Sequence, residues 1–265
     1  MAGNLTYLIT GSNRGIGRQI VADLLLRPAT TVVATARDSD SSTSRSLGTL
    51  PTAAGSRLVV VPLDGSREDT GHETLRQRLK NKDIGRLDVV VANAGIADIG
   101  FVLQTEATEA RECFEVNSLG VLRLFQACWP LMEQSDPTSG GNKFVLITSF
   151  VGSIGGLGLK EPMAKFNLLP VAEFGWTAYG MSKASANWLA RKISFEFRDK
   201  GLLVGVINPG CVNTDMTQRL ANKAGVEPLC MPVEHSSRCV LEQVDRLCPD
   251  TSGKFLNFDG EEIPW

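Results

Sequence analysis

Tyr179 and Lys183 are the residues whose types and spacing point most directly to chemistry. Residues four positions apart lie on one face of a helix, so a phenol and an ammonium group can reach the same small volume. A free tyrosine has a pKa of about 10, and a nearby cation lowers that value. We expect Lys183 to bring the pKa of Tyr179 near 7, a shift of roughly 3 units or about 4 kcal/mol. General acid–base catalysis needs a group tuned in this way, although the same spacing is common on ordinary helix surfaces.

Composition limits the classes of protein to which the chain can belong. Of its 265 residues, 43% are hydrophobic and 21% are charged, and the net charge is −2. This composition is typical of a globular protein with a sizeable core. The balanced charge gives no reason to expect nucleic acid or a membrane surface as a partner. No apolar run approaches the roughly 18 residues of a membrane span, and we expect a cytoplasmic protein.

The six cysteines form no metal-ligand pattern and include no Cys-x-x-Cys pair. A zinc site built from Cys230, His235 and Cys239 would lack both the ligand spacing and a clear fourth donor. We therefore expect no bound metal, and buried structural thiols in a reducing compartment. Cys211 is expected to be one of these small buried thiols.

Short apolar segments alternate with longer amphipathic ones along the chain. Uninterrupted apolar runs such as residues 32–36 and 87–92 are typical of strands buried on both faces of a parallel sheet. Strands are expected at 4–10, 31–36, 57–63, 87–92, 143–148, 203–208 and 254–258, and helices near 15–26, 67–82, 106–134, 177–200 and 233–247. The alternation predicts one α/β domain over residues 1–265, a doubly wound parallel sheet of about seven strands flanked by helices.

Two stretches interrupt this alternation. Residues 38–56 are rich in serine and threonine, and we expect a mobile loop there. Residues 150–176 carry several glycines and prolines. Because candidate catalytic residues lie on both sides of this second stretch, we expect an extended substrate loop rather than a linker.

The first expected strand ends in a glycine-rich turn that opens a helix. Gly11 permits the tight turn, Gly15 lets a ligand approach the backbone, and Gly17 permits close packing of helix on strand. The N-terminus of the helix offers free N–H groups and a favourable dipole to a pyrophosphate. At the start of a βαβ unit, this pattern predicts a Rossmann-type dinucleotide site. Its expected residues are Gly11, Ser12, Asn13, Arg14, Gly15, Ile16 and Gly17.

The charge at the end of the second strand indicates which dinucleotide is bound. An acidic residue there would bind the ribose 2′-hydroxyl of NAD, whereas Arg37 accommodates the 2′-phosphate of NADP. Arg14 adds a second positive charge on the same side. Asp38 is an alternative ligand for the ribose if Arg37 turns away. We expect NADPH/NADP as the cofactor.

Polar and small residues end the third and fourth strands, where ligands sit in such sheets. Asp64 follows the third strand and is expected either to bind the adenine or to serve as an ordinary capping aspartate. Asn93 is expected to tie strands together, and Ala94 and Gly95 to let the cofactor lie close.

These motifs together resemble the short-chain dehydrogenase/reductase family over nearly the whole chain. The resemblance rests on TGSNRGIG at 10–17, NAG at 93–95, Asn117, Ser149, YxxxK at 179–183 and Pro209-Gly210, in that order. The segments 152–156, 178–193 and 258–265 are similar to the branch that holds fungal norsolorinic acid ketoreductase and animal carbonyl reductases.

The resemblance implies a role for each matched residue. Tyr179 would give a proton to a substrate carbonyl oxygen, and Ser149 would hydrogen-bond and polarise that oxygen. Lys183 would lower the tyrosine pKa and hold the nicotinamide ribose. Asn117 would anchor a water that links Lys183 to solvent. Pro209, Gly210, Val212 and Thr214 would frame the nicotinamide.

Simpler interpretations remain open for several of these residues. Ser149 could be a strand-end cap, with Ser153 as a rival for its catalytic role, and Asn117 could be a surface residue. Met181 and Trp188 are expected to pack rather than to contact substrate.

The long segment between Ser149 and Tyr179 departs from most of the family. Its apolar residues predict a bulky or aromatic ketone as the small-molecule partner. The same segment could cover the helical face through which many relatives associate, so both a homo-oligomer and a monomer remain open. The leading hypothesis is an NADPH-dependent carbonyl reductase of a polyketide or aromatic ketone. Its alternatives are an alcohol dehydrogenase in the oxidative direction, a non-catalytic dinucleotide sensor, and a dehydratase or epimerase.

Overall fold

The computed structural model describes residues 4–66, 72–136, 141–158, 175–227 and 229–265. Within them, seven parallel strands form one sheet in the order β3-β2-β1-β4-β5-β6-β7. The strands are β1 (Thr6–Ile9), β2 (Thr31–Ala36), β3 (Arg57–Pro62), β4 (Val89–Ala92), β5 (Lys143–Ile147), β6 (Leu203–Asn208) and β7 (Phe255–Asn257). The strand order reverses at β1, which lies between β2 and β4. The predicted doubly wound sheet is confirmed, and its crevice opens at the carboxyl ends of these strands.

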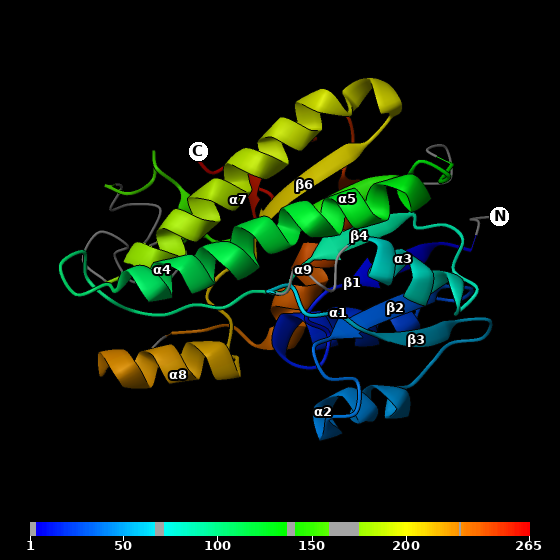
Figure 1. Ribbon diagram of the computed structural model, residues 1–265, viewed down its shortest axis with the longest axis horizontal. Helices are drawn as coiled ribbons and strands as arrows, with labels where there is room; N and C mark the ends of the chain where they lie inside the picture. The colour runs from blue at the N-terminus through cyan, green and yellow to red at the C-terminus, as the bar shows by residue number, and fades with distance from the viewer. Residues whose placement is uncertain (1–3, 67–71, 137–140, 159–174, 228) are drawn as a thin grey trace.

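Helices cover both faces of the sheet (Figure 1). On one face lie α1 (Gly15–Leu25) and α9 (Val233–Arg246), and on the other α3 (His72–Lys80), α5 (Gly120–Met132) and α7 (Thr177–Glu196). A further helix, α4 (Ala107–Phe114), continues the line of α5 and packs beside α7. The helix α8 (Asp215–Ala224) lies apart from both layers, below α4 in the view of Figure 1.

Alternate side chains along each strand enter opposite layers of the core. Leu8 and Val33 pack toward α5 and α7, whereas Ile9 and Val32 pack toward α1 and α9. Every residue of β2, β4 and β5 is buried, which explains why these strands are uninterrupted apolar runs in the sequence. Burial of each such aliphatic side chain contributes about 1.5–3 kcal/mol, so the sheet is a firm base for the residues at its carboxyl edge.

The structure corrects two of the expected elements and adds a helix. The helix expected over 106–134 is divided by a π-helical turn, Glu115–Leu119. The stretch 38–56 is not irregular throughout, because it contains α2 (Ser42–Arg45) and a 3₁₀ helix (Ser46–Thr49) whose Leu47 is buried in the core. Helix α8 was not expected at all.

Parts of two expected segments lie outside the described residues. Of the helix expected at 67–82, residues 72–80 are described as helical. Of the substrate loop expected at 150–176, residues 159–174 are not described, and 150–152 form a 3₁₀ turn. None of the described helices combines the length and apolar character needed to cross a membrane.

Candidate active site

A cavity of about 640 Å³ runs along the carboxyl ends of the strands and gathers most of the predicted site residues. The glycine loop and Arg37 line one end, and Ser149, Tyr179 and Lys183 line another part. The predicted residues in its lining are Gly11, Asn13, Arg14, Gly15, Ile16, Arg37, Asp64, Asn93, Ala94, Gly95, Ser149, Tyr179, Lys183, Pro209, Gly210, Val212 and Thr214. Three others, Ser12, Gly17 and Asn117, lie behind the wall.

The glycine loop has the backbone shape that a dinucleotide site needs. Gly11 and Gly15 adopt φ values of +66° and +53°, which disfavour any residue with a Cβ atom. A Cβ on Gly11 would lie 2.9 Å from the Cα of Ala94, so the loop packs directly on the end of β4. Asn93 fastens this contact, because its Nδ2 donates to the Thr10 carbonyl at 2.8 Å. The predicted role of Asn93 in tying the strands together is therefore visible in the structure.

Ser12 and Gly17 shape the loop from behind. The Ser12 side chain is fully buried and donates to the Ile9 carbonyl at 2.7 Å, which directs it away from the cavity. A Cβ on Gly17 would collide with the Asn93 amide and the Gly11 carbonyl, so its role is close helix–strand packing, as expected.

Arg14 and Arg37 give one end of the cavity a positive charge. Both side chains are exposed and line the cavity. The competing Asp38 is held in its own turn, because its Oδ1 accepts from the Asp40 N–H at 2.8 Å. Its carbonyl oxygen accepts from Ser44 Oγ at 2.6 Å. Asp38 lines the same cavity, so it is the two positive charges of Arg14 and Arg37 that favour an anionic group at this end.

Two hydroxyl residues at this end were not anticipated. Ser41 and Thr43 line the cavity, and Asn13 Nδ2 donates to Thr43 Oγ1 at 2.9 Å. This bond joins the glycine loop to the segment after β2. The serine- and threonine-rich composition of residues 39–46 was the available signal, since hydroxyl groups suit a phosphate.

Asp64 lies at the edge of the cavity and shapes the turn after β3. Its Oδ1 accepts from the backbone N–H of Ser66 at 3.0 Å and from its hydroxyl at 2.7 Å. Arg123, which the sequence did not single out, holds the same turn by donating to the Gly65 carbonyl at 2.8 Å. Arg123 also pairs with Glu115 at 2.5 Å and so joins this turn to the π-helical turn that carries Asn117.

The catalytic candidates meet where β5 faces α7. Ser149 follows β5, and its Oγ accepts from the Val151 N–H at 3.2 Å, so it caps a 3₁₀ turn while lining the cavity. Lys183 is almost fully buried and donates from Nζ to the Ile147 carbonyl at 3.0 Å. Its Nζ lies 5.7 Å from the centroid of the Tyr179 ring. The helical spacing thus brings phenol and ammonium together, as expected.

The protonation of the pair differs from the expectation. Burial raises the pKa of Tyr179 to about 12, although a hydrogen bond with the Ser149 side chain opposes the rise. Burial also lowers the pKa of Lys183 to about 8. The prediction that Lys183 brings the pKa of Tyr179 near 7 is therefore wrong for this structure. Desolvation disfavours both charged forms, and the Lys183 ammonium is engaged by a backbone carbonyl.

Asn117 supports this pair from inside the wall. Its Oδ1 accepts from the Ile96 N–H at 2.9 Å, and its Nδ2 donates to the Ile96 carbonyl at 2.8 Å and to Ser182 Oγ at 2.9 Å. It is fully buried, so it is not a polar surface residue. Gly95 leaves room for it, because a Cβ there would lie 3.1 Å from Asn117 Oδ1 and 3.7 Å from Lys183 Nζ.

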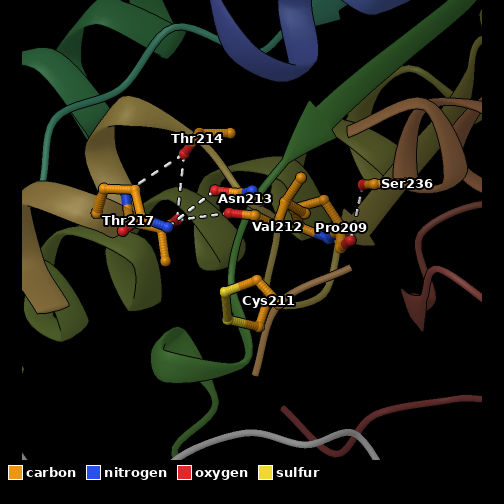
Figure 2. Close-up of a disulfide and its surroundings, with 9 residues drawn as sticks. Pro209, Cys211, Val212, Asn213, Thr214, Thr217 and Ser236 are labelled. Carbon is orange, nitrogen blue, oxygen red and sulfur yellow. Dashed lines mark hydrogen bonds between the residues drawn. A yellow bond between two sulfur atoms is a disulfide. The ribbon is translucent and has the colours of Figure 1, made fainter. Parts of the chain in front are cut away.

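The segment after β6 forms the wall expected to frame a nicotinamide (Figure 2). The Pro209 carbonyl accepts from Ser236 Oγ at 2.8 Å, and the Val212 carbonyl accepts from Thr217 Oγ1 at 2.7 Å. Thr214 caps α8 and lies against the glycine loop, since a Cβ on Gly15 would be 3.3 Å from its methyl carbon.

Cys211 in this wall is not the free buried thiol that the sequence suggested. It is partly exposed and forms a disulfide with Cys230. Of the remaining four cysteines, Cys113 and Cys128 are buried thiols as expected, whereas Cys239 and Cys248 are half-buried. Within the described part of the chain, no cluster of metal-ligating side chains is present.

Apolar side chains form much of the remaining lining of the cavity. They come from the segment after β4, from the 3₁₀ turn after β5, from the start of α7 and from α8, and include Ile96, Ile99, Val151, Trp176, Met216 and Leu220. The Trp176 ring lies 6.0 Å from the Tyr179 ring, between centroids.

The structure shows where Ser153, Met181 and Trp188 lie, whose roles the sequence left open. Ser153 is buried, bonds the Pro264 carbonyl and does not line the cavity, which removes it as a rival of Ser149. Met181 and Trp188 neither pack nor line the cavity. Their exposed fractions of 61% and 67% show that the expectation of a packing role was wrong.

Comparison with known proteins agrees with this geometry. The family model described as short chain dehydrogenase matches residues 6–160 and 170–225. Short chain dehydrogenase gsfK of Penicillium aethiopicum is 37% identical over 98% of this chain and 99% of its own. A norsolorinic acid ketoreductase of Dothistroma septosporum is 38% identical over 98% of this chain and 92% of its own.

Among solved structures, an NADPH-bound carbonyl reductase from chicken fatty liver superposes with a TM-score of 0.82 at 27% identity, covering 100% of both chains. Fold, motif order and full-length similarity agree, and the chain belongs to the short chain dehydrogenase family of oxidoreductases.

Proposed function

We propose that the protein is an NADPH-dependent ketoreductase that reduces an aromatic or polyketide ketone to the alcohol. The observation that carries the proposal is the single cavity that has Arg14 and Arg37 at one end and Ser149, Tyr179 and Lys183 beside an apolar wall. The overall reaction would consume the ketone, NADPH and one proton, and would yield the alcohol and NADP.

The cofactor preference follows from the charges at the glycine-loop end. Arg14 and Arg37 would hold a 2′-phosphate, with the hydroxyl groups of Ser41 and Thr43 as further donors. The positive φ values of Gly11 and Gly15 leave the backbone open to a pyrophosphate. The NADPH-bound carbonyl reductase that shares the fold supports this assignment.

Bound in the cavity, NADPH would supply the hydride for the carbonyl carbon. Tyr179 would give its proton to the carbonyl oxygen, and its pKa of about 12 keeps the phenol protonated at neutral pH. The Ser149 hydroxyl would donate a hydrogen bond to the same oxygen and fix its position. Lys183, with a pKa of about 8, is charged over much of the neutral range and would stabilise the phenolate that forms.

The substrate class rests on the apolar wall and on the relatives. Trp176, Met216 and Leu220 offer a surface that suits a large, flat ketone better than a small polar one. Norsolorinic acid ketoreductases of Dothistroma septosporum and Aspergillus parasiticus are 38% and 33% identical to this chain. A panel of aliphatic, steroidal and aromatic polyketide ketones, each with NADPH and NADH, tests this class. Equal turnover of short aliphatic ketones would argue against it.

The proposed chemistry is tested by Tyr179→Phe, which removes only the phenolic hydroxyl. We expect kcat for ketone reduction to fall about 10²- to 10⁴-fold, the usual contribution of a positioned proton donor, while NADPH binding is retained. Tyr7→Phe is the matched control, because Tyr7 is the other of the two tyrosines and is buried against α1 and α9. Retained turnover in Tyr179→Phe would refute the proposed role.

A further inference from the structure

The disulfide between Cys211 and Cys230 lies in the wall of the cavity rather than in the core. Cys211 follows Gly210 at the carboxyl end of β6 and lines the cavity. Cys230 lies 19 positions further along the chain, and the two Cα atoms are 4.8 Å apart. Figure 2 shows the sulfur–sulfur bond below Val212, which lines the same cavity.

This disulfide ties together the two ends of the segment that contains α8. Met216, Leu220 and Ala224 of α8 line the cavity beside the proposed ketone site. A crosslink that encloses a wall element restricts how far that element can move. The bond between Cys211 and Cys230 is therefore placed to control the position of this wall.

The polar contacts between α8 and the segment after β4 lie at the surface. Lys223 pairs with Asp98 at 2.7 Å, but the Lys223 side chain is 49% exposed, so the pair contributes little. The exposed Arg219 donates to the Ala97 carbonyl at 2.6 Å. Both contacts connect α8 to the segment after β4, on the opposite side of the cavity mouth. Without the crosslink, α8 would be held by these surface contacts, by its buried Leu220 and Ala221, and by the bond from Thr217 to the Val212 carbonyl.

Loss of the crosslink would leave the surrounding backbone paired. The Met231 N–H donates to the Cys211 carbonyl at 2.9 Å, and the Asn213 N–H donates to the Met231 carbonyl at 3.0 Å. These bonds and the bridge between Val212 and Met231 do not involve sulfur. Reduction is thus expected to loosen the wall without unfolding the protein.

The disulfide lies where a thiol from solution can approach it. Both residues are partly exposed. Cys113 and Cys128 are buried thiols, and burial raises the pKa of both, so they are poor partners in thiol chemistry. A disulfide that joins functional surface segments is typical of redox-sensitive sites in proteins that meet cellular thiols.

We propose that Cys211 and Cys230 form a thiol–disulfide exchange site that sets the affinity of the enzyme for its ketone through α8. A thiolate of a small-molecule or protein dithiol attacks one sulfur atom, the bond between the two cysteines breaks, and a mixed disulfide forms. The second thiol of the reductant then displaces the other cysteine. The protein gains two electrons and two protons as two thiols, and the reductant leaves as its own disulfide.

The expected consequence is a change in KM rather than in kcat. With the wall loosened, ketone binding must order the side chains of α8. We expect the KM for the ketone to rise roughly three- to tenfold, the range for ordering one or two side chains on binding. Ser149, Tyr179 and Lys183 lie on other elements, so kcat is expected to stay close to its original value.

The experiment compares the full-length protein after treatment with glutathione disulfide and after treatment with dithiothreitol, with each reagent removed. Thiol titration in denaturant should find four free thiols in the disulfide form and six after reduction. Cys230→Ser should show the high KM under both treatments. Cys239→Ser, a half-buried cysteine outside the cavity lining, should keep the response of the original chain. Saturating NADP should slow reduction, because Cys211 lines the cavity.

A second measurement does not depend on turnover. Only the expected change in KM rests on the proposed function. Limited digestion with trypsin reports the freedom of α8, whose Arg219 and Lys223 are exposed. Cleavage there should be faster in the reduced protein and in Cys230→Ser. If no ketone is reduced in either state, the proposed function fails, and cleavage rates and thiol counts still test the exchange site. Six thiols after glutathione disulfide, or equal cleavage rates together with equal KM values in both states, would overturn the proposal.

Discussion

Three features of the Lys183 side chain determine its protonation and its relation to Tyr179. It is buried, it donates to the Ile147 carbonyl, and its Nζ lies 5.7 Å from the ring centroid of Tyr179. Burial disfavours its charged form and lowers its pKa to about 8, close to the pH at which enzymes work. Tyr179, with a pKa of about 12, stays protonated through the same range. The first group of the pair to titrate as the pH rises is therefore the lysine.

This order of titration predicts the pH dependence of ketone reduction. We expect kcat/KM to fall as the pH rises through about 8, because the lysine loses its proton and no longer stabilises a developing phenolate. Initial rates at low ketone concentration between pH 6 and pH 10, with NADPH saturating, measure this profile. In Lys183→Arg, whatever activity remains should lose this alkaline decline, since arginine stays charged. A flat profile up to pH 10 in the original chain would contradict the assignment.

Arg37 is expected to decide between the two nicotinamide cofactors. Arg37→Ala should weaken NADPH binding about 10- to 100-fold, the value of a charge-assisted hydrogen bond, and leave NADH binding unchanged. Fluorescence titration with each cofactor measures the effect. Arg45→Ala is the matched control, because Arg45 is exposed on the neighbouring α2 but does not line the cavity. Equal weakening of NADH would mean that Arg37 supports the fold of the loop instead.

At the scale of elements, the π-helical turn Glu115–Leu119 joins two parts of the site. It carries the buried Asn117, and its Glu115 pairs with Arg123 of α5. Arg123 also donates to the Gly65 carbonyl in the turn after β3. One guanidinium group therefore holds the turn after β3, at the edge of the cavity, against the element that carries Asn117. Such π-helical turns often occur at functional sites.

Arg123→Gln should consequently affect cofactor binding more than chemistry. We expect the KM for NADPH to rise roughly 5- to 20-fold, since two charge-assisted contacts are lost, with kcat within a factor of about two. Steady-state kinetics with saturating ketone give both values. Lys192→Gln removes an exposed ion pair on α7 and serves as the control. A fall in kcat with an unchanged KM would show that Arg123 acts on the catalytic residues instead.

The elements of the sheet could be predicted from sequence because each strand that is buried on both faces leaves an uninterrupted apolar run. Helix α8 was missed although its ends are marked by Thr214 as N-cap and Gly225 in the left-handed conformation. Its apolar residues Met216, Leu220 and Ala224 recur every four positions, but the helix has only ten residues and most of the others are polar, so the signal is weaker than that of a core helix. Local patterns predict elements that pack on the core and miss those that only border a cavity.

The same distinction applies to the site. The glycine loop, Arg37 and the Tyr179–Lys183 pair could be predicted because each is a short local motif. The disulfide between Cys211 and Cys230 and the contact of Arg123 with Gly65 join distant parts of the chain, and no spacing rule predicts such pairs. The direction of the Tyr179 pKa shift could not be predicted from the sequence either, because it depends on how deeply the folded protein buries the phenol.

At the scale of the whole molecule, residues 263–265 hold the segment that follows Ser149 against the sheet. Ile263 N–H donates to the Phe255 carbonyl of β7 at 2.8 Å, and the Trp265 carbonyl accepts from Gly155 N–H at 2.5 Å. The Pro264 carbonyl accepts from the Ser153 hydroxyl. The segment that follows Ser149 is therefore anchored to the edge strand β7, and three strands separate β7 from β1, which precedes the glycine loop.

Trp265→Ala tests whether this anchor links stability to catalysis. The indole packs against Phe255 at 5.6 Å between ring centroids and beneath the Arg191 guanidinium at 5.5 Å. Because the side chain is only partly buried, we expect a loss of about 2 kcal/mol, below the usual cost of removing a core tryptophan. For a chain of this size, that loss lowers Tm by about 4–8 °C.

Catalysis should respond in the same variant, because loss of the indole loosens the C-terminal segment whose backbone carbonyls hold Ser153 and Gly155, and Ser149 precedes Ser153 by one short turn. We expect kcat/KM for the ketone to fall while NADPH binding is kept, since the glycine loop is at a distant strand. Thermal unfolding and steady-state kinetics give the two values. Trp188→Ala is the control, because Trp188 is 67% exposed on α7 and its loss should leave Tm and kcat/KM unchanged. A lower Tm with unchanged kcat/KM would show that the anchor stabilises the fold without positioning Ser149.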